Sequence, residues 1–118
     1  MLVTHADATA AAEPVDLLAK QGTGPLWGMA SADLNATLLS WPPGHEVPEH
    51  INADLDVLVV VVAGRVAVVI DGSPHDLQAG SAILVARGVR RRIVAGDSGV
   101  RYLSIHRRRG PLQIEPQR

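Results

Sequence analysis

The sequence predicts an all-β protein, a sandwich or barrel of short strands. Short runs rich in Val, Ile, Leu and Ala recur from residue 25 onward, at the length of single strands. Glycine, proline and Asp-Gly turns separate them, and tight hairpins need such residues where φ is positive. A helical period is not sustained anywhere; residues 14–20 suggest at most one short helical turn.

The strands are expected in a regular order along the chain. They are residues 26–30, 34–41, 46–52, 56–63, 65–71, 81–86, 90–95 and 100–106. The turns between them are expected at residues 42–44, 63–65, 71–74, 78–80, 86–88 and 96–99. Strand lengths of this kind, with turns every few residues, favour one compact β-domain.

The chain has the length of one domain, 118 residues. We expect an N-terminal arm over residues 1–24, the β-barrel over residues 25–110 and a C-terminal tail over residues 111–118. Hydrophobic residues make up 47% of the chain and aromatic residues only 3%, so the core must be aliphatic. The run 57–62 does not alternate between apolar and polar residues, which predicts cover on both faces and hence a homodimer.

Composition excludes several classes of function. The chain has no cysteine, which rules out disulfides, thiolate metal sites and cysteine nucleophiles. The N-terminus does not resemble a signal peptide and the longest apolar run is too short to span a bilayer, so we expect a cytoplasmic protein with no membrane partner. The net charge of −1 argues against a nucleic-acid partner. Carboxylates gather within residues 46–76 and arginines within 87–109, and we expect these segments to meet in the fold.

Two segments resemble the sequence motifs of the cupin superfamily. In the first motif a glycine precedes two histidines, a glutamate and a second glycine, and Gly44, His50 and Gly64 fall at matching positions. Asn52 stands where the second histidine belongs. For the glutamate, counting back from the second glycine gives Val57 and counting forward from the asparagine gives Asp56.

The second motif is similar over residues 80–91. Gly80, Ala86, Gly88 and Arg91 stand where cupins have glycine, proline, glycine and histidine. The resemblance implies a jelly-roll β-barrel, also called a double-stranded β-helix, of the RmlC-like kind. It leaves the function open, because cupins include dioxygenases, isomerases, epimerases, decarboxylases, storage proteins and sugar-binding domains.

The resemblance also implies a metal held by three histidines and a glutamate inside the barrel, and this chain retains only His50. An asparagine is a weak ligand for transition metals, and an arginine stays protonated beside the ion. We therefore expect no cofactor. The alternative is a divalent transition metal held by His50, Asp56 and His106. That set requires His106 to face inward, and it would point out if the aliphatic side of its strand lined the barrel.

A polar cluster is the competing interpretation of the same residues. His50, Asn52, Asp56 and Arg91 would line a ligand-binding pocket in an aliphatic barrel. Arg91 could pair with Asp56 and fill the cavity, or it could hold the carboxylate or phosphate of a small ligand. The sequence thus predicts a binding protein for a small, anionic molecule. A metal-dependent cupin enzyme of dioxygenase or isomerase type and a non-catalytic structural or regulatory module are the alternatives.

Overall fold

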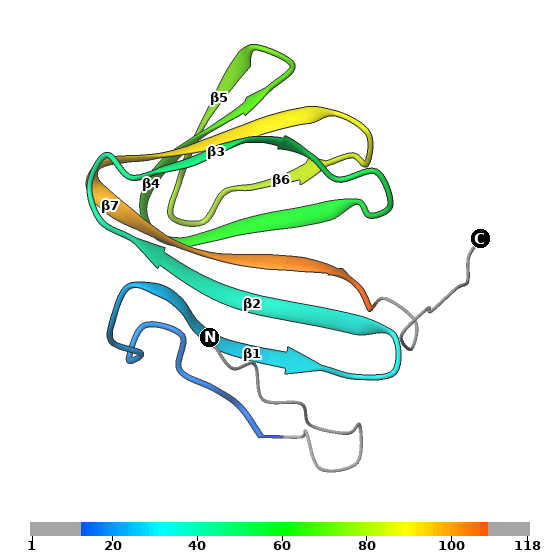
Figure 1. The fold of residues 1–118 in the computed structure, drawn as a ribbon. Helices are drawn as coiled ribbons and strands as arrows, with labels where there is room; N and C mark the ends of the chain where they lie inside the picture. The colour runs from blue at the N-terminus through cyan, green and yellow to red at the C-terminus, as the bar shows by residue number, and fades with distance from the viewer. Residues whose placement is uncertain (1–12, 109–118) are drawn as a thin grey trace.

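The computed structural model describes residues 13–108, and within this range it contains seven β-strands and no helix (Figure 1). Among these residues there is consequently no helix with the length and apolar character to cross a membrane. The strands are β1 (Gly24–Ala30), β2 (Leu34–Trp41), β3 (Glu46–Ile51), β4 (Val57–Ile70), β5 (Ser73–Gln78), β6 (Ala82–Val85) and β7 (Arg90–Arg107). The all-β prediction is confirmed.

Two antiparallel layers share the long strands β4 and β7. In the first layer the order is β1-β2-β7-β4-β6, and it uses residues 100–107 of β7 and 57–64 of β4. In the second layer the order is β3-β7-β4-β5, and it uses residues 90–95 of β7 and 65–70 of β4. Figure 1 shows β1 and β2 on one side of the molecule and β3 and β5 on the other. The result is a jelly-roll barrel with its core between the layers.

Both shared strands bend where the layers meet. The sequence predicts turns at residues 63–65 and 96–99, and this is wrong, because β4 and β7 continue through both segments. Register shifts lie at 61–63 and 64–66 of β4, so the bend is made by irregular pairing within one strand. Gly64 has φ of 75°, and a Cβ there would overlap the carbonyl oxygen of Gly99. Glycine is thus required at this corner by both conformation and space.

Side chains of the valine-rich strand alternate between core and surface. Val59 and Val61 are buried in the core, whereas Leu58 is 37% exposed. The inner cluster of buried side chains is Val59, Val61, Val66, Val68, Leu77, Val85, Ala95, Val100 and Tyr102. The barrel interior therefore covers one face of the run 57–62, as predicted, and the prediction that a second subunit covers the other face stays a prediction.

The sequence did not predict strand β5. β5 is an edge strand in which only Leu77 is buried, and it contains Pro74 and charged or polar residues, which are uncommon in strands. The hairpin before it was expected from its Asp-Gly pair. Asp71 and Gly72 both have positive φ, 48° and 86°, as a two-residue hairpin loop requires.

The segment before β1 is held against the barrel by the side chain of Arg101, whose Nη1 donates to Leu17 O and Leu18 O. Residues Leu17–Ala19 form one turn, in which Ala19 N donates to Asp16 O at 3.2 Å. The short helical turn expected at 14–20 is therefore reduced to a single hydrogen-bonded turn. Residues 1–12 of the expected arm and the whole expected tail, 111–118, lie outside the described residues.

Acidic and basic segments meet, as the sequence predicts, although mostly through the backbone. An ion pair joins Arg92 Nη1 to Glu46 Oε1 at 3.4 Å. Elsewhere Asp71 Oδ1 accepts a hydrogen bond from Arg90 N at 3.0 Å. The carboxylates thus fix the backbone of the arginine-rich segment more than they neutralise its side chains.

Candidate functional site

A cavity of about 280 Å³ lies inside the barrel between the two layers. Its wall is largely aliphatic, and its polar side chains come from β3, from the loop after it and from both halves of β7. The polar lining residues are His50, Asn52, Arg91, Tyr102, Ser104 and His106; the others are Leu39, Trp41, Val47, Val57, Val59, Val68, Val85 and Ile93. An apolar cavity with a few convergent polar groups is the usual form of a small-molecule site.

Arg91 brings a charged side chain into this cavity. It lies on β7 between β3 and β4, opposite His50 and Ile70, and only 5% of its surface is exposed. Its Nε donates to Val89 O at 3.3 Å and its Nη2 to Ala86 O at 3.0 Å. Burial lowers the pKa of Arg91 from its ordinary value, but a guanidinium remains a cation at neutral pH. Both partners are neutral carbonyls, so the charge itself is not compensated by them.

Of the two alternatives for Arg91, the pair with Asp56 is not formed. Asp56 is exposed and is absent from the cavity wall. Its Oδ1 accepts a hydrogen bond from Arg87 N at 2.8 Å, which ties the loop before β4 to the loop before β7. The carboxylate has this role because β4 begins at Val57 and places the side chain of that valine, not the aspartate, on the inner face.

His50 and Asn52 lie where the sequence places them, at the more exposed end of the cavity. His50 Nδ1 lies 3.0 Å from Pro48 O. Because a carbonyl only accepts, Nδ1 is the donor of this hydrogen bond. Asn52 Oδ1 accepts hydrogen bonds from Asp54 N and Leu55 N, both at 3.1 Å. The asparagine therefore uses its carbonyl oxygen to shape the loop and keeps its amide N–H groups for other partners.

His106 faces the cavity, so the polar side of its strand lines the barrel. The aliphatic neighbours Leu103 and Ile105 lie on the opposite side of β7. His106 Nδ1 lies 2.8 Å from Arg107 O, and Nε2 lies 3.4 Å from Asn35 Nδ2. The imidazole is the Nδ1–H tautomer in this arrangement, and its remaining lone pair accepts from the asparagine.

Two further polar residues of the wall, Tyr102 and Ser104, were missed as site residues. Tyr102 is 3% exposed, and its hydroxyl accepts a hydrogen bond from Trp41 Nε1 at 3.1 Å. Burial raises the pKa of Tyr102 above its ordinary value, with the bond from Trp41 acting in the opposite direction. The sequence did contain a signal for them: Tyr102, Ser104 and His106 are polar residues at every second position, and such residues share one face of a strand.

Comparison with known proteins agrees with this architecture. A cupin domain profile matches residues 37–106, which is more than half of the chain. The chain belongs to the cupin domain family. A cupin protein from Bacteroides fragilis is 28% identical, with 68% of this chain and 70% of that chain covered at a TM-score of 0.61. A cupin-2 domain protein from Shewanella frigidimarina is 24% identical, with 77% and 86% covered and a TM-score of 0.65. None of the curated proteins gives a significant match.

The metal-binding positions of this cupin carry the wrong donors for a transition metal. His50, Asn52, Val57 and Arg91 all line the cavity, so the residue at the glutamate position is the valine. Only the imidazole is a good ligand for a transition metal. The other three positions supply an amide oxygen already bonded to two N–H groups, a hydrocarbon side chain and a cation, so they do not complete a ligand set. Within residues 13–108 no group of three His, Cys, Asp or Glu side chains is placed to hold an ion. The alternative set of His50, Asp56 and His106 is therefore not assembled.

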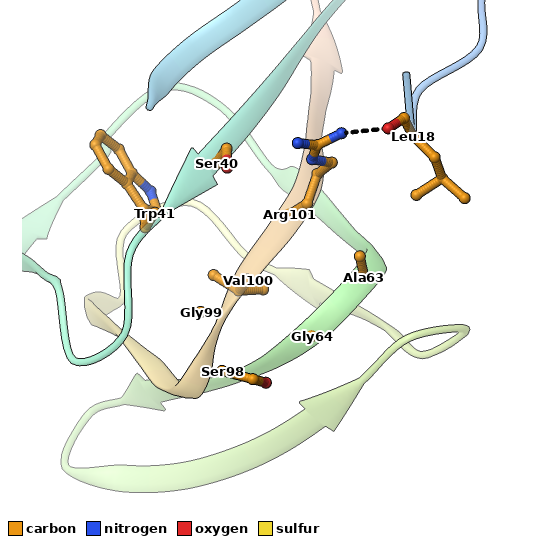
Figure 2. A pocket seen from close by; sticks show the side chains of 9 residues that line it. All are labelled: Leu18, Ser40, Trp41, Ala63, Gly64, Ser98, Gly99, Val100 and Arg101. Atoms are coloured by element: carbon orange, nitrogen blue, oxygen red, sulfur yellow. Dashed lines mark hydrogen bonds between the residues drawn. The ribbon is translucent and has the colours of Figure 1, made fainter. Parts of the chain in front are cut away.

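A second hollow lies outside the barrel of this cupin, at the corner between the layers (Figure 2). It measures about 270 Å³ and is lined by Leu18, Ser40, Trp41, Ala63, Gly64, Ser98, Gly99, Val100 and Arg101. Arg101 Nη1 donates to Leu17 O at 2.9 Å and to Leu18 O at 3.0 Å. Figure 2 shows the guanidinium turned toward Leu18. This arginine fastens the N-terminal segment to the barrel, so the hollow is a structural junction.

Proposed function

We propose that this cupin binds a small organic anion inside its barrel, with Arg91 as the anchor of the negative charge. The observation that carries the proposal is a buried guanidinium on the wall of an open cavity, whose hydrogen-bond partners among residues 13–108 are only neutral carbonyls. A buried charge is costly unless it meets an opposite charge. An anionic ligand would supply that charge each time it binds.

The free donors of the site fit an anion better than a cation. A guanidinium has five N–H groups, and two of them are used by Val89 and Ala86, which leaves three for a ligand. Asn52 lines the same cavity, and its hydrogen bonds within residues 13–108 use the carbonyl oxygen and not the amide N–H groups. A carboxylate accepts hydrogen bonds from such donors and gains additional stability because one of them is charged.

The size of the cavity limits the ligand. About 280 Å³ is at the lower end of the range of ligand pockets, so the anion is smaller than a dinucleotide or a drug-sized molecule. The surrounding valine, leucine and isoleucine side chains favour a short carbon chain behind the charged group. Small carboxylates are therefore the first ligands to test, followed by small phosphate esters.

Two other functions are less well supported by the geometry. A metal-dependent enzyme would need a ligand set that the cavity wall lacks. A module with a filled barrel would need the cavity to be closed by an Arg91–Asp56 pair, and Asp56 bonds to Arg87 N instead. Binding is the function that the cavity wall supports.

The test is isothermal titration of pentanoate, propionate and inorganic phosphate into the wild-type protein and Arg91→Gln. Loss of a charged hydrogen-bonding partner should weaken carboxylate binding at least about tenfold. Arg90→Gln is the matched control, because it removes an exposed arginine next in the sequence and should leave affinity unchanged. Arg91→Lys keeps the charge and should bind with intermediate affinity. Equal affinity in Arg91→Gln and the wild type would refute the proposal.

A further inference from the structure

Two hydroxyl groups on the inner face of β7 have no part in holding the anion. Tyr102 and Ser104 line the same cavity as Arg91, but they lie on the other half of β7, beyond its bend. Hydroxyl groups in a cavity lined with aliphatic side chains need hydrogen-bond partners. A ligand in the cavity would have to supply these hydrogen-bond partners.

Tyr102 offers one hydrogen-bond donor in a fixed position. Its hydroxyl oxygen accepts the N–H of Trp41, and among the described residues no protein acceptor is found for its own proton. The indole is itself held, because it stacks on the His45 ring with centroids 4.2 Å apart and planes 10° from parallel. The phenol is thus oriented by a bond that uses its oxygen, and this leaves the proton for a group in the cavity.

Ser104 provides a second hydroxyl nearer to the opening. It lies two residues from Tyr102 on the same face of the strand, about 7 Å along β7. Within residues 13–108 its side chain has no hydrogen bond to another protein group. A serine hydroxyl can donate or accept, so it fits an alcohol or a carbonyl oxygen of a ligand.

The anion anchor and the tyrosine lie on the two halves of β7, on either side of its bend. Arg91 pairs with His50 near the exposed end, whereas Tyr102 is next to the bend of β7. The wall between them is formed by Val59, Val68 and Ile93. A ligand held by its charge at the arginine would therefore reach the hydroxyls with its far end.

Resting on the proposed function, we propose that the cavity selects carboxylates that carry a hydroxyl or carbonyl oxygen several carbons away from the charge, with Ser104 and Tyr102 as the residues that recognise this oxygen. Plain aliphatic carboxylates of the same length would leave both hydroxyls without a partner. A site that contains buried polar groups discriminates strongly against a ligand that cannot pair with them.

The experiment compares two five-carbon ligands, pentanoate and its oxo derivative levulinate, by isothermal titration. In the wild type, levulinate should bind about tenfold more tightly than pentanoate. Tyr102→Phe and Ser104→Ala should each reduce this ratio about threefold or more, while the affinity for pentanoate stays within about twofold. Ser40→Ala, a serine on the outer side of the neighbouring strand β2, is the matched control and should leave the ratio unchanged.

The outcomes separate this inference from the proposed function. If the wild type binds both ligands equally well and Arg91→Gln binds neither, the anion site stands and the selectivity does not. If the wild type binds neither ligand, both proposals fall. Tyr102→Phe also removes the acceptor for Trp41 Nε1, so thermal unfolding of each variant is measured in parallel. Ser104→Ala breaks no such bond, and an unchanged ratio in this variant would overturn the role of the serine even if the phenylalanine variant were unstable.

Discussion

At the scale of single residues, the direction of a strand's side chains decides what the site can do. The motif positions predicted that His50, Asn52 and Arg91 would share a pocket, and they line one cavity. The orientation of 102–106 could not be predicted, because one face is aliphatic and the other polar, and an aliphatic face usually points inward. Here the aliphatic face lies on the outside of the first layer. The side chains of Tyr102, Ser104 and His106, which alternate with it, therefore line the interior of the barrel.

The buried tyrosine predicts a specific dependence on pH. Burial raises the pKa of Tyr102, so the folded protein keeps the neutral phenol after the unfolded chain has begun to ionise. The free energy of unfolding should be unaffected by this residue below pH about 10 and should fall as the pH rises above that value. Because it is the only tyrosine in the chain, tyrosinate absorbance reports this one group.

The measurement is an alkaline absorbance titration in buffer and in denaturant. The midpoint should be higher in buffer than in denaturant, and Tyr102→Phe should show no transition. Coinciding midpoints in the two solvents would show that the phenol is not shielded from water.

At the scale of elements, the two bent strands explain both the success and the failure of the sequence analysis. Gly64, Gly96 and Gly99 marked the places where the chain changes direction, and the bends lie there. A sequence pattern does not distinguish a turn from a bend, because glycine serves both and pairing on either side is long-range. At the same corner β7 passes from the layer that contains Arg91 to the layer that contains Tyr102. The cavity between the layers is therefore bounded by this corner.

Two alanine substitutions at equal φ test the packing of this corner. Gly44 and Gly64 both have φ of 75°, but an added Cβ at Gly44 has no neighbour within 4 Å, whereas one at Gly64 overlaps Gly99. Gly44→Ala should lower the free energy of unfolding by about 1–2 kcal/mol, the cost of the left-handed conformation. Gly64→Ala should lower it by about 4 kcal/mol, because overpacking adds to that cost. Denaturant unfolding measures both, and equal losses would contradict the close approach at the bend.

At the scale of the whole molecule, the outer surfaces of the two layers differ in character. On the first layer Leu58 pairs with Leu84 and Ile105, and Val60 pairs with Ala82 and Leu103, so apolar residues lie side by side across three strands. On the second layer the outer residues include the Arg92–Glu46 ion pair and the Arg65–Gln78 hydrogen bond. The homodimer expected from the valine-rich run stays a prediction, and the apolar layer is the surface on which it depends.

A charged residue on the apolar surface tests this assembly. Val60→Glu should give monomers or aggregates in sedimentation velocity, because it places a carboxylate in the expected interface. Val69→Glu is the matched control: it makes the same change on the second layer, where Val69 pairs with Arg92, and should leave the assembly unchanged. A Val60→Glu protein with the same oligomeric state as the wild type would contradict the interface.

In our proposal the barrel of this cupin recognises an anion through Arg91 and without a metal ion. The most direct measurement is titration of levulinate into untagged protein before and after treatment with a chelator, with the metal content of both samples measured by elemental mass spectrometry. We predict the same affinity in both samples, whatever metal the first one contains. If binding is lost when the metal is removed and returns when the metal is restored, the account is contradicted, and His50 would be a metal ligand.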